Sequence, residues 1–154
     1  MLRIVQEAES LRADLSVTVQ EDAAAYEAVL QAYKLPKDTE EQLRERSQVI
    51  ERATWGAIRP PLAVARKSVE VLRLLLTGIT HGNINALSDG GSGAALALAS
   101  LRGACLNVRV NVASLAKSDE TRQVVEELSL LEQQAAGLEQ EIKEVMNRRG
   151  DLLF

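Results

Sequence analysis

The sequence predicts an all-α protein, a bundle of about five long, mostly antiparallel helices. Alanine, leucine, valine and glutamate abound while aromatic residues make up only 3% of the chain, a composition that favours helices over sheets. Apolar residues recur at alternating steps of three and four along most of the sequence, which is the spacing of one helix face. The breaks between these segments are short, so consecutive helices are expected to run antiparallel.

A proline separates the first two expected helices. Residues 2–34 contain neither proline nor glycine and keep one apolar stripe, which predicts one long helix. Pro36 ends it, because the residue before a proline is pushed out of the helical region. Thr39 is placed to cap a second helix with acidic residues in its first turn, running to about residue 58.

Two consecutive prolines predict another break. Pro60 and Pro61 would end the second helix, and Pro61 suits the first position of a third helix over residues 61–79. Residues 78–91 are rich in glycine, asparagine, serine and aspartate, so they are expected to form the one long irregular connection.

The last two expected helices complete the bundle. Residues 92–117 carry only two charges before the final lysine, which predicts a central helix buried around most of its circumference, capped by Asp89 or Ser92. Residues 118–150 open with a capping signal at Ser118 and follow a heptad-like apolar stripe from residue 124 to 145. They end at two arginines and a glycine, as helices commonly do.

Composition bounds the class of protein. A chain of 154 residues, 46% of them hydrophobic, can bury its own core, so one domain over residues 1–154 is expected. The 22 acidic and 18 basic residues are interspersed, which leaves no basic face for nucleic acid. The longest apolar stretch falls short of the roughly 20 residues that span a membrane, and the N-terminus lacks a signal core. We therefore expect a cytoplasmic protein that binds neither nucleic acid nor membrane.

Residue counts also bear on metals. One histidine and one cysteine argue against a zinc site or a di-iron bundle, so no metal ligands are assigned. The single cysteine, Cys105, cannot form an internal disulfide and sits among apolar neighbours, which predicts a small buried side chain in a reducing compartment.

Asp22 interrupts the apolar stripe of the first helix. A carboxylate on that stripe needs a partner, because burial of an unpaired charge costs several kcal/mol. Another side chain, a second subunit or a ligand would satisfy it. The alternative is that Asp22 lies at the edge of the stripe and is solvated.

Two asparagines share a face of the fourth helix. Asn107 and Asn111 are four residues apart, on a stripe continued by small residues. This stripe serves either interhelical hydrogen bonding in a close-packed core or the wall of a pocket that offers amide groups to a heterocycle. Arg109 shares another face with Arg102, and either reaches solvent or holds a carboxylate.

The densest polar cluster lies in the expected connection between Gly82 and Gly91. Its glycines allow close backbone approach, and the following helix start offers free N–H groups, which suits a binding site. An ordinary connection with capping residues fits equally well. The polar members are Asn83, Asn85, Ser88 and Asp89.

These same segments resemble a known family. Residues 22–26 (Asp-Ala-Ala-Ala-Tyr) with 32–37, 61–65 (Pro-Leu-Ala-Val-Ala), 82–89 (Gly-Asn-Ile-Asn-Ala-Leu-Ser-Asp) and 107–111 (Asn-Val-Arg-Val-Asn) resemble the landmarks of the cyclodeaminase domain of formiminotransferase-cyclodeaminase. Its stand-alone bacterial relatives include methenyltetrahydrofolate cyclohydrolases. The order and spacing hold over most of the chain.

The resemblance implies an all-helical homodimer that acts on a tetrahydrofolate derivative without a cofactor. The implied reactions are loss of ammonia from 5-formiminotetrahydrofolate or hydrolysis of 5,10-methenyltetrahydrofolate. Both pass through a tetrahedral carbon between two nitrogens, so the protein must position them and move protons. On this basis the expected catalytic residues are Asp22 and Asp89, and the expected substrate-binding residues are Asn83, Asn85, Ser88, Asn107, Arg109 and Asn111.

One feature of the family is missing at the start of this sequence. Its members usually begin with a Pro-Gly-Gly-Gly-Ser-like segment that leads into an additional helix. We therefore expect the domain to be N-terminally incomplete, with an apolar groove left where a helix would pack. The alternative function is a non-catalytic helical interaction or dimerisation module, whose contact surface would be the stripe from residue 124 to 145.

Overall fold

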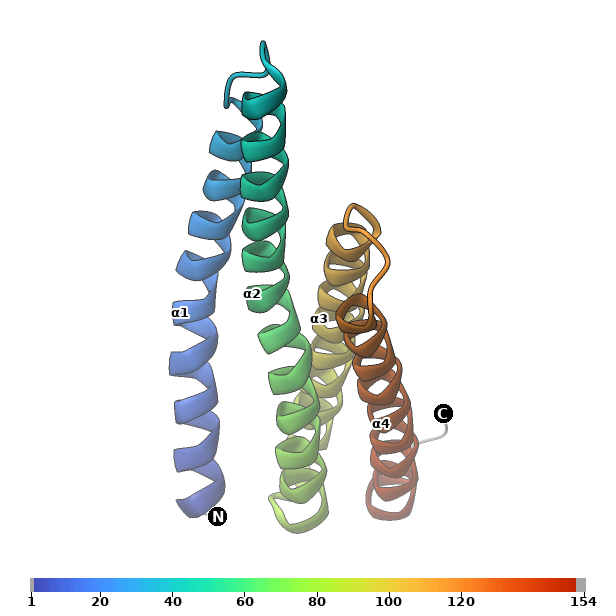
Figure 1. Cartoon of the computed structure of the whole chain (residues 1–154). Helices are drawn as coiled ribbons and strands as arrows, with labels where there is room; N and C mark the ends of the chain where they lie inside the picture. The colour runs from blue at the N-terminus through green and yellow to red at the C-terminus, as the bar shows by residue number, and fades with distance from the viewer. Residues whose placement is uncertain (1, 152–154) are drawn as a thin grey trace.

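The protein is an all-α bundle in the computed structural model, which describes residues 2–151. The prediction of an all-α fold is confirmed, and no strand occurs in this described range. Neighbouring helices run antiparallel (Figure 1). The elements in chain order are α1 (Leu2–Tyr33), α2 (Glu40–His81), the short 3-10 helix η1 (Ile84–Ala86), α3 (Leu87–Ala113) and α4 (Asp119–Gly150).

The described part of the chain has four long helices rather than five. The expected second and third helices are one helix, α2, which continues through Pro60 and Pro61. Each proline removes a backbone donor, so the carbonyls of Gly56 and Ala57 lose their usual partners four residues later. The Asn111 side chain on α3 donates to the Ala57 carbonyl at 3.1 Å. Tertiary packing around two buried prolines thus sustains a helix that local rules would interrupt.

The expected irregular stretch at 78–91 is also mostly helical. Only Gly82 and Asn83 separate α2 from η1, and α3 begins at Leu87, five residues earlier than expected. The expectation that Asp89 or Ser92 caps this helix is wrong: Ala86 is the N-cap residue and makes no side-chain capping bond.

Close packing explains why glycines near the start of α3 do not prevent helix formation there. A Cβ atom on Gly90 would lie 2.5 Å from Ile79 Cγ1, and one on Gly91 would lie 2.7 Å from Met146 Cε. Glycine lacks a Cβ, so α3 approaches both neighbouring helices closely. The van der Waals attraction between the closely packed helices offsets the poor intrinsic helix propensity of glycine.

The predicted helix starts at residues 39 and 118 are confirmed. Thr39 and Ser118 each form a capping box with the residue three positions later. The last helix ends at Gly150, as expected, and is followed by Asp151 in the left-handed conformation with φ of 52°.

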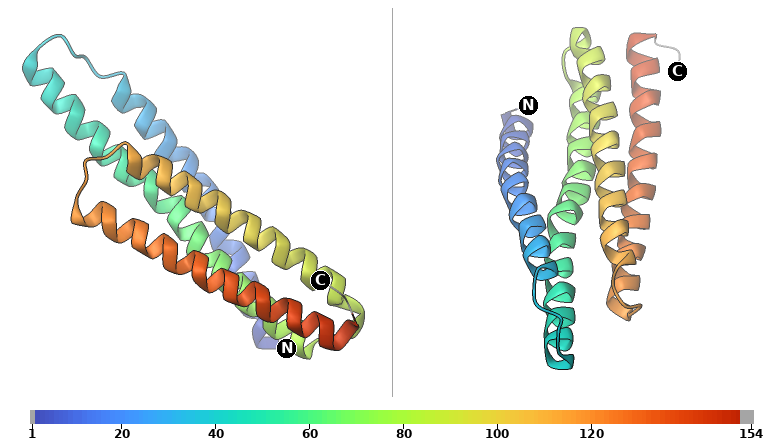
Figure 2. Two further views of the ribbon diagram at one scale, coloured as in Figure 1. Left: turned by 90° about the vertical axis from the view of Figure 1, so that its right-hand side faces the viewer. Right: turned by 90° about the horizontal axis from the view of Figure 1, so that it is seen from above.

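Helix α2 contacts each of the other long helices, whereas α1 packs mainly on α2. The right-hand view of Figure 2 shows α1 set apart from α3 and α4. The core lies between α2, α3 and α4, with Leu72, Leu101 and Leu128 at its centre. The stripe of α4 from 124 to 145 faces this core as expected.

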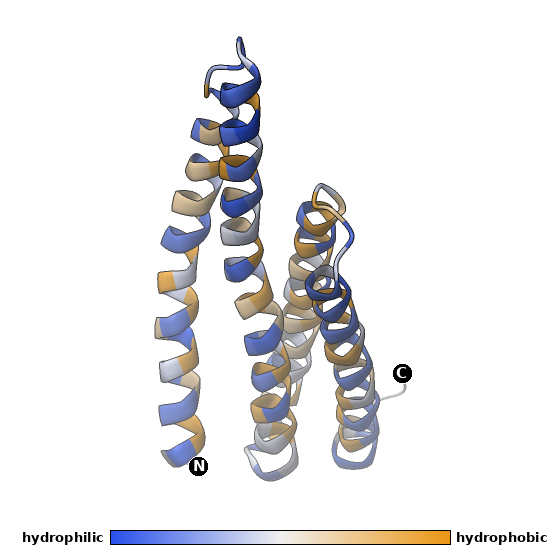
Figure 3. Ribbon diagram, in the orientation of Figure 1, coloured by the Kyte–Doolittle hydropathy of each residue, from blue (hydrophilic) through white to orange (hydrophobic). Residues whose placement is uncertain are grey.

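Helix α3 is not buried all round in the single chain. Its inner face is buried, but Leu96, Leu106 and Val110 are 72%, 63% and 62% exposed. The ribbon coloured by hydropathy shows apolar residues along the visible part of α3 (Figure 3). The expectation of a helix buried around most of its circumference is wrong for the chain alone, because α1 lies against α2 and leaves this face open.

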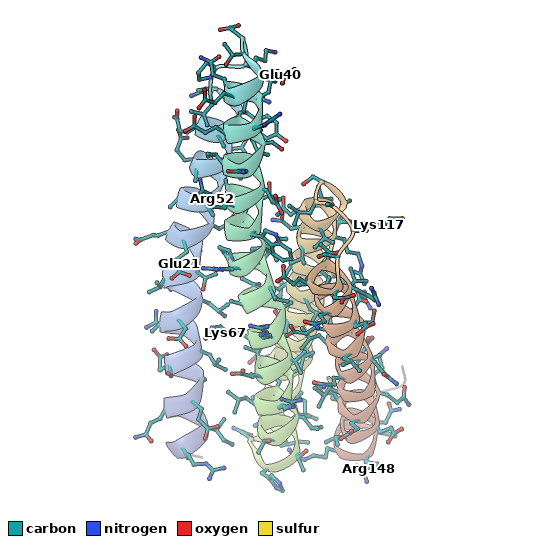
Figure 4. The ribbon with its side chains drawn as sticks, in the orientation of Figure 1. Glu21, Glu40, Arg52, Lys67, Lys117 and Arg148 are labelled. Atoms are coloured by element: carbon teal, nitrogen blue, oxygen red, sulfur yellow. The ribbon has the colours of Figure 1, made fainter. Side chains whose placement is uncertain are left out.

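Helix α1 is attached to α2 by a few anchors. Leu11, Thr18 and Ala32 are its buried residues within the described range. Lys67 of α2 reaches the Asp14 carboxylate at 2.6 Å (Figure 4). Across residues 2–151, no helix has both the length and the apolarity required to cross a bilayer.

Candidate functional site

A groove runs between α1 and α3, with α2 as its floor. Its larger compartment, of about 670 Å³, lies between the first half of α1, the last third of α2 and the start of α3. The walls are mainly aliphatic, and Leu15 marks the end of this compartment. Its polar groups are few and come from Arg12, Asn83 and Asp89.

A smaller compartment of about 370 Å³ continues the groove past Leu15, which lines both. Asp22 enters it from α1 and Asn107 from α3, while Pro60 and Pro61 form its floor. Ligand pockets in proteins are typically about 300–1,000 Å³, mostly apolar, with a few polar groups that orient the ligand. Both compartments have this character.

Asp22 is exposed to the solvent of the groove. Its carboxylate has no hydrogen bond or ion pair with any side chain in the described range. Of the two interpretations of its position on the stripe, the structure of the single chain agrees with a solvated edge residue. The carboxylate is consequently free to meet a ligand.

Asn83 and Asp89 lie on either side of η1, at the end of the larger compartment where α2 connects to α3. The Asn83 side chain accepts a hydrogen bond from the Asn85 backbone N–H at 3.0 Å, which caps η1. Asp89 lies in the first turn of α3, where the free N–H groups of a helix start favour negative charge. The two residues thereby have defined backbone positions beside the larger compartment.

The sequence offered two interpretations of the asparagine pair, and each asparagine agrees with a different one. Asn111 donates to the Ala57 carbonyl and to Asn107 Oδ1, both at 3.1 Å, so it serves interhelical bonding. Asn107 lines the smaller compartment, where it keeps its own amide donor. Asn111 therefore orients Asn107 rather than lining the groove itself.

Besides Asn111, three of the predicted residues line neither compartment. Asn85 and Ser88 are exposed beside the turn, and the Ser88 carbonyl accepts from the Ser92 hydroxyl. Arg109 points toward α4, where its guanidinium binds both Glu132 carboxylate oxygens at 2.8 and 2.7 Å. This hydrogen bonding lowers the pKa of Glu132 and raises the pKa of Arg109. Of the two roles considered for Arg109, it takes that of holding a carboxylate within the chain.

Two residues near the groove escaped the sequence prediction. Arg12 lines the larger compartment and pairs with Glu9 on the same helix; an exposed i, i+3 ion pair gives no local sign of a site. Arg149 of α4 binds the backbone just before Asn83. Nothing in the sequence near Arg149 indicates a contact with a segment almost seventy positions away.

Four of the segments that carry the family resemblance meet in this groove, whereas residues 32–37 do not line it. Residues 22–26, 61–65, 82–89 and 107–111 each contribute at least one lining side chain. They come from three different helices and one turn, so only the tertiary fold brings them together.

The chain is similar to known proteins. The chain is 34% identical over 147 residues to a methenyltetrahydrofolate cyclohydrolase from Methylorubrum extorquens, covering 96% of this chain and 71% of that protein. It is 31% identical over 135 residues to the formimidoyltransferase-cyclodeaminase of Sus scrofa, of which it spans only 25%. The crystal structure of formiminotetrahydrofolate cyclodeaminase from Thermotoga maritima matches with a TM-score of 0.81 and 29% identity, over 96% of this chain and 70% of that one.

A model of the formiminotransferase-cyclodeaminase family matches residues 1–130. This range contains all of the segments that line the groove and all eight predicted site residues. The chain belongs to the formiminotransferase-cyclodeaminase family.

Proposed function

We propose that this protein interconverts one-carbon derivatives of tetrahydrofolate, as a formiminotetrahydrofolate cyclodeaminase or a 5,10-methenyltetrahydrofolate cyclohydrolase. The observation that carries the proposal is the placement of Asp22, Asn83, Asp89 and Asn107 along one groove. A non-catalytic scaffold does not require these four polar side chains to lie in one apolar groove. The relatives named for these two reactions support the choice of substrate.

The groove suits a flat heterocycle with a one-carbon bridge. Aliphatic walls would cover the faces of the pterin, and the Asn107 and Asn83 amides would pair with its polar edge. In cyclodeamination N10 attacks the formimino carbon and ammonia departs from the tetrahedral intermediate. In the hydrolytic reaction water adds to the methenyl carbon and the bond to N5 breaks.

Both reactions need proton transfer to a departing nitrogen. We assign that task to Asp22 or Asp89, since each carboxylate lies in the groove without a partner among the described side chains. A positioned carboxylate typically contributes about 10²–10⁴-fold to such a step. Cys105, the single cysteine of the chain, is buried as a free thiol. This fits a protein that works in the reducing cytoplasm.

We further propose that the protein is a homodimer that covers the exposed face of α3. The single chain has 9966 Å² of accessible surface, whereas a compact protein of 16.8 kDa would have about 7,700 Å². The excess is larger than the roughly 800 Å² per partner of a standard interface. Leu96, Leu106 and Val110 would form the apolar centre of that interface.

The alternative of a non-catalytic module loses its expected surface. The stripe from 124 to 145 was its contact face, yet Leu128, Ala135 and Ile142 are 0%, 1% and 3% exposed in the core. That stripe is already occupied by α2 and α3.

The deciding experiment is to add 5,10-methenyltetrahydrofolate to the protein and follow loss of its chromophore. A second arm supplies 5-formiminotetrahydrofolate and measures ammonia. Acceleration of one reaction supports the proposal and identifies which reaction is native. A folded protein that accelerates neither and does not bind a folate would overturn it.

A further inference from the structure

The end of α4 holds the backbone at one end of the groove. The Arg149 guanidinium donates to the carbonyl of Ile79 and, at 3.0 Å, to that of Gly82. The last carbonyls of a helix have no partner within the helix, and a cation is favoured there. Arg149 therefore caps α2 from a distant part of the chain.

One turn earlier, α4 makes a second contact with the same region. Met146 is 4% exposed, and its Cε lies so close to Gly91 that an added Cβ would be 2.7 Å away. Asn83 and Asp89 lie between these two anchor points in the sequence. Neither compartment is lined by a described residue of α4, so α4 supports this segment from behind the groove.

The hydrogen bonds within the supported segment are all short-range. The Gly82 N–H donates to the Gly78 carbonyl and the Ala86 N–H to the Asn83 carbonyl, while the Asn85 N–H donates to the Asn83 side chain. The two bonds from Arg149 connect this region to α4. The planar guanidinium of Arg149 presents its N–H groups in a fixed fork that meets both carbonyls, whereas a lysine ammonium carries its donors on one freely rotating group without this preset geometry. The guanidinium thus binds the backbone immediately before Asn83.

We propose that Arg149, with Met146 beside it, is a positioning residue for Asn83 and Asp89. This inference rests on the proposed function of the groove. The family model matches residues 1–130, so the contact from Arg149, called the Arg149 clamp below, lies beyond the range of that model.

The first test measures backbone hydrogen exchange in wild type, Arg149→Ala and Arg149→Lys. Arg148→Ala is the matched control, because Arg148 is exposed on the same last turn (Figure 4). Loss of two charge-assisted bonds is expected to speed exchange over residues 78–91 by about tenfold or more in Arg149→Ala. Arg149→Lys should lie in between, and Arg148→Ala should match wild type. Unchanged exchange over 78–91 in Arg149→Ala overturns the clamp.

The second test measures turnover below the unfolding temperature of each variant. Arg149→Ala is expected to lower kcat/KM by about tenfold, mainly through a higher KM, because a displaced contact group weakens substrate placement. Arg149→Lys should recover part of this loss. Faster exchange with unchanged kcat and KM would refute the positioning role. If wild type neither binds nor converts a folate, the proposed function fails, while the exchange result still decides whether Arg149 holds the segment.

Discussion

Asp22 and Asn107 reach the smaller compartment from two different helices. Asp22 is exposed there, while Asn107 is held by a bond from Asn111. Asn111 in turn satisfies the Ala57 carbonyl left without a donor by Pro61. A proline in α2 and two asparagines in α3 therefore form one structural unit, and substitution of each member has a different expected consequence.

If Asp22 rather than Asp89 is the group that transfers the proton, Asp22→Asn is expected to lower turnover by about 10²–10⁴-fold, since an amide cannot transfer the proton. Helicity and dimer content should remain unchanged because Asp22 makes no bond with a described side chain. Steady-state kinetics and circular dichroism check both parts. Glu21→Gln is the matched control: the adjacent exposed carboxylate (Figure 4) should be replaceable without effect. Loss of fold in Asp22→Asn would instead assign Asp22 a structural role.

Asn111→Ala is expected to reduce the free energy of unfolding by about 1–2 kcal/mol, because the Ala57 carbonyl loses its donor. In a Pro61→Ala background the same substitution should cost less, since the new backbone N–H can bond to that carbonyl. Urea unfolding of the four proteins in this double-mutant cycle measures the coupling. Strictly additive losses would contradict the link between Asn111 and Pro61.

At the scale of the elements, α2 organises the fold and small residues let α3 approach it. Ion pairs then connect α4 to both neighbours. Arg66 of α2 binds Glu127 at 2.5 and 2.8 Å, and Arg109 of α3 binds Glu132. Close packing sets the distance between helices, and these pairs contribute to their register.

Gly90→Ala is expected to destabilise the protein by about 1–3 kcal/mol, because its Cβ would overlap Ile79. Gly137→Ala on α4 meets no atom within 4 Å and should stabilise by about 0.5–1 kcal/mol through helix propensity. Thermal unfolding measures both changes: the melting temperature should fall in Gly90→Ala and rise in Gly137→Ala. Equal shifts in both would contradict the close-packing explanation for the glycines of α3.

Stability is expected to fall at acid pH. Hydrogen bonds from Arg109 and Arg66 lower the pKa values of Glu132 and Glu127 in the folded chain. Their stabilisation is therefore complete above the unfolded value of about 4.3 and is lost as pH falls through the lower folded values.

Glu132→Gln should make the free energy of unfolding less dependent on acid pH. The expected reduction in the acid-induced loss is about 0.5–1 kcal/mol, since solvent screens a pair that is about one-third exposed. Urea unfolding between neutral and acid pH measures the slope. Glu126→Gln, an exposed change on the same helix, should leave it unaltered. A wild-type slope in Glu132→Gln would show that the pair contributes nothing.

At the scale of the whole molecule, the open side between α1 and α3 is the dominant feature. The groove and the exposed face of α3 adjoin there. The accessible surface is large for the mass of the chain. This supports the proposal that a second copy covers the exposed face of α3.

Leu106→Glu is expected to convert the proposed dimer to a monomer, because an unpaired charge at the centre of an apolar interface costs several kcal/mol. Sedimentation velocity measures the mass, and circular dichroism reports whether the helices remain. Leu130→Glu on α4, where Leu130 is 58% exposed, serves as the control and should leave the dimer intact. A wild-type protein that is monomeric at all concentrations would refute the proposed interface.

Short-range sequence signals predicted the helical class, the ends of α1 and α4, the N-caps Thr39 and Ser118 and the apolar stripe of α4. These depend on residues within a few turns of one another. Local rules also placed a break at Pro60 and a long connection at 78–91, and both predictions were wrong. At the prolines, the Asn111 side chain supplies a donor to the Ala57 carbonyl and the helix continues. At residues 78–91, the close approach of Gly90 and Gly91 to other helices favours an early start of α3.

The candidate site divides in the same way. Asp22, Asn83, Asp89 and Asn107 stood out in the sequence as polar groups at unusual positions, and the family resemblance made them expected site residues; all four line the groove. No local signal predicts that Arg109 faces Glu132 or that Arg149 binds the Gly82 carbonyl just before Asn83, because both contacts depend on the packing of distant helices. Helix periodicity gives the face on which a side chain lies, but the partner of that face depends on how distant helices pack.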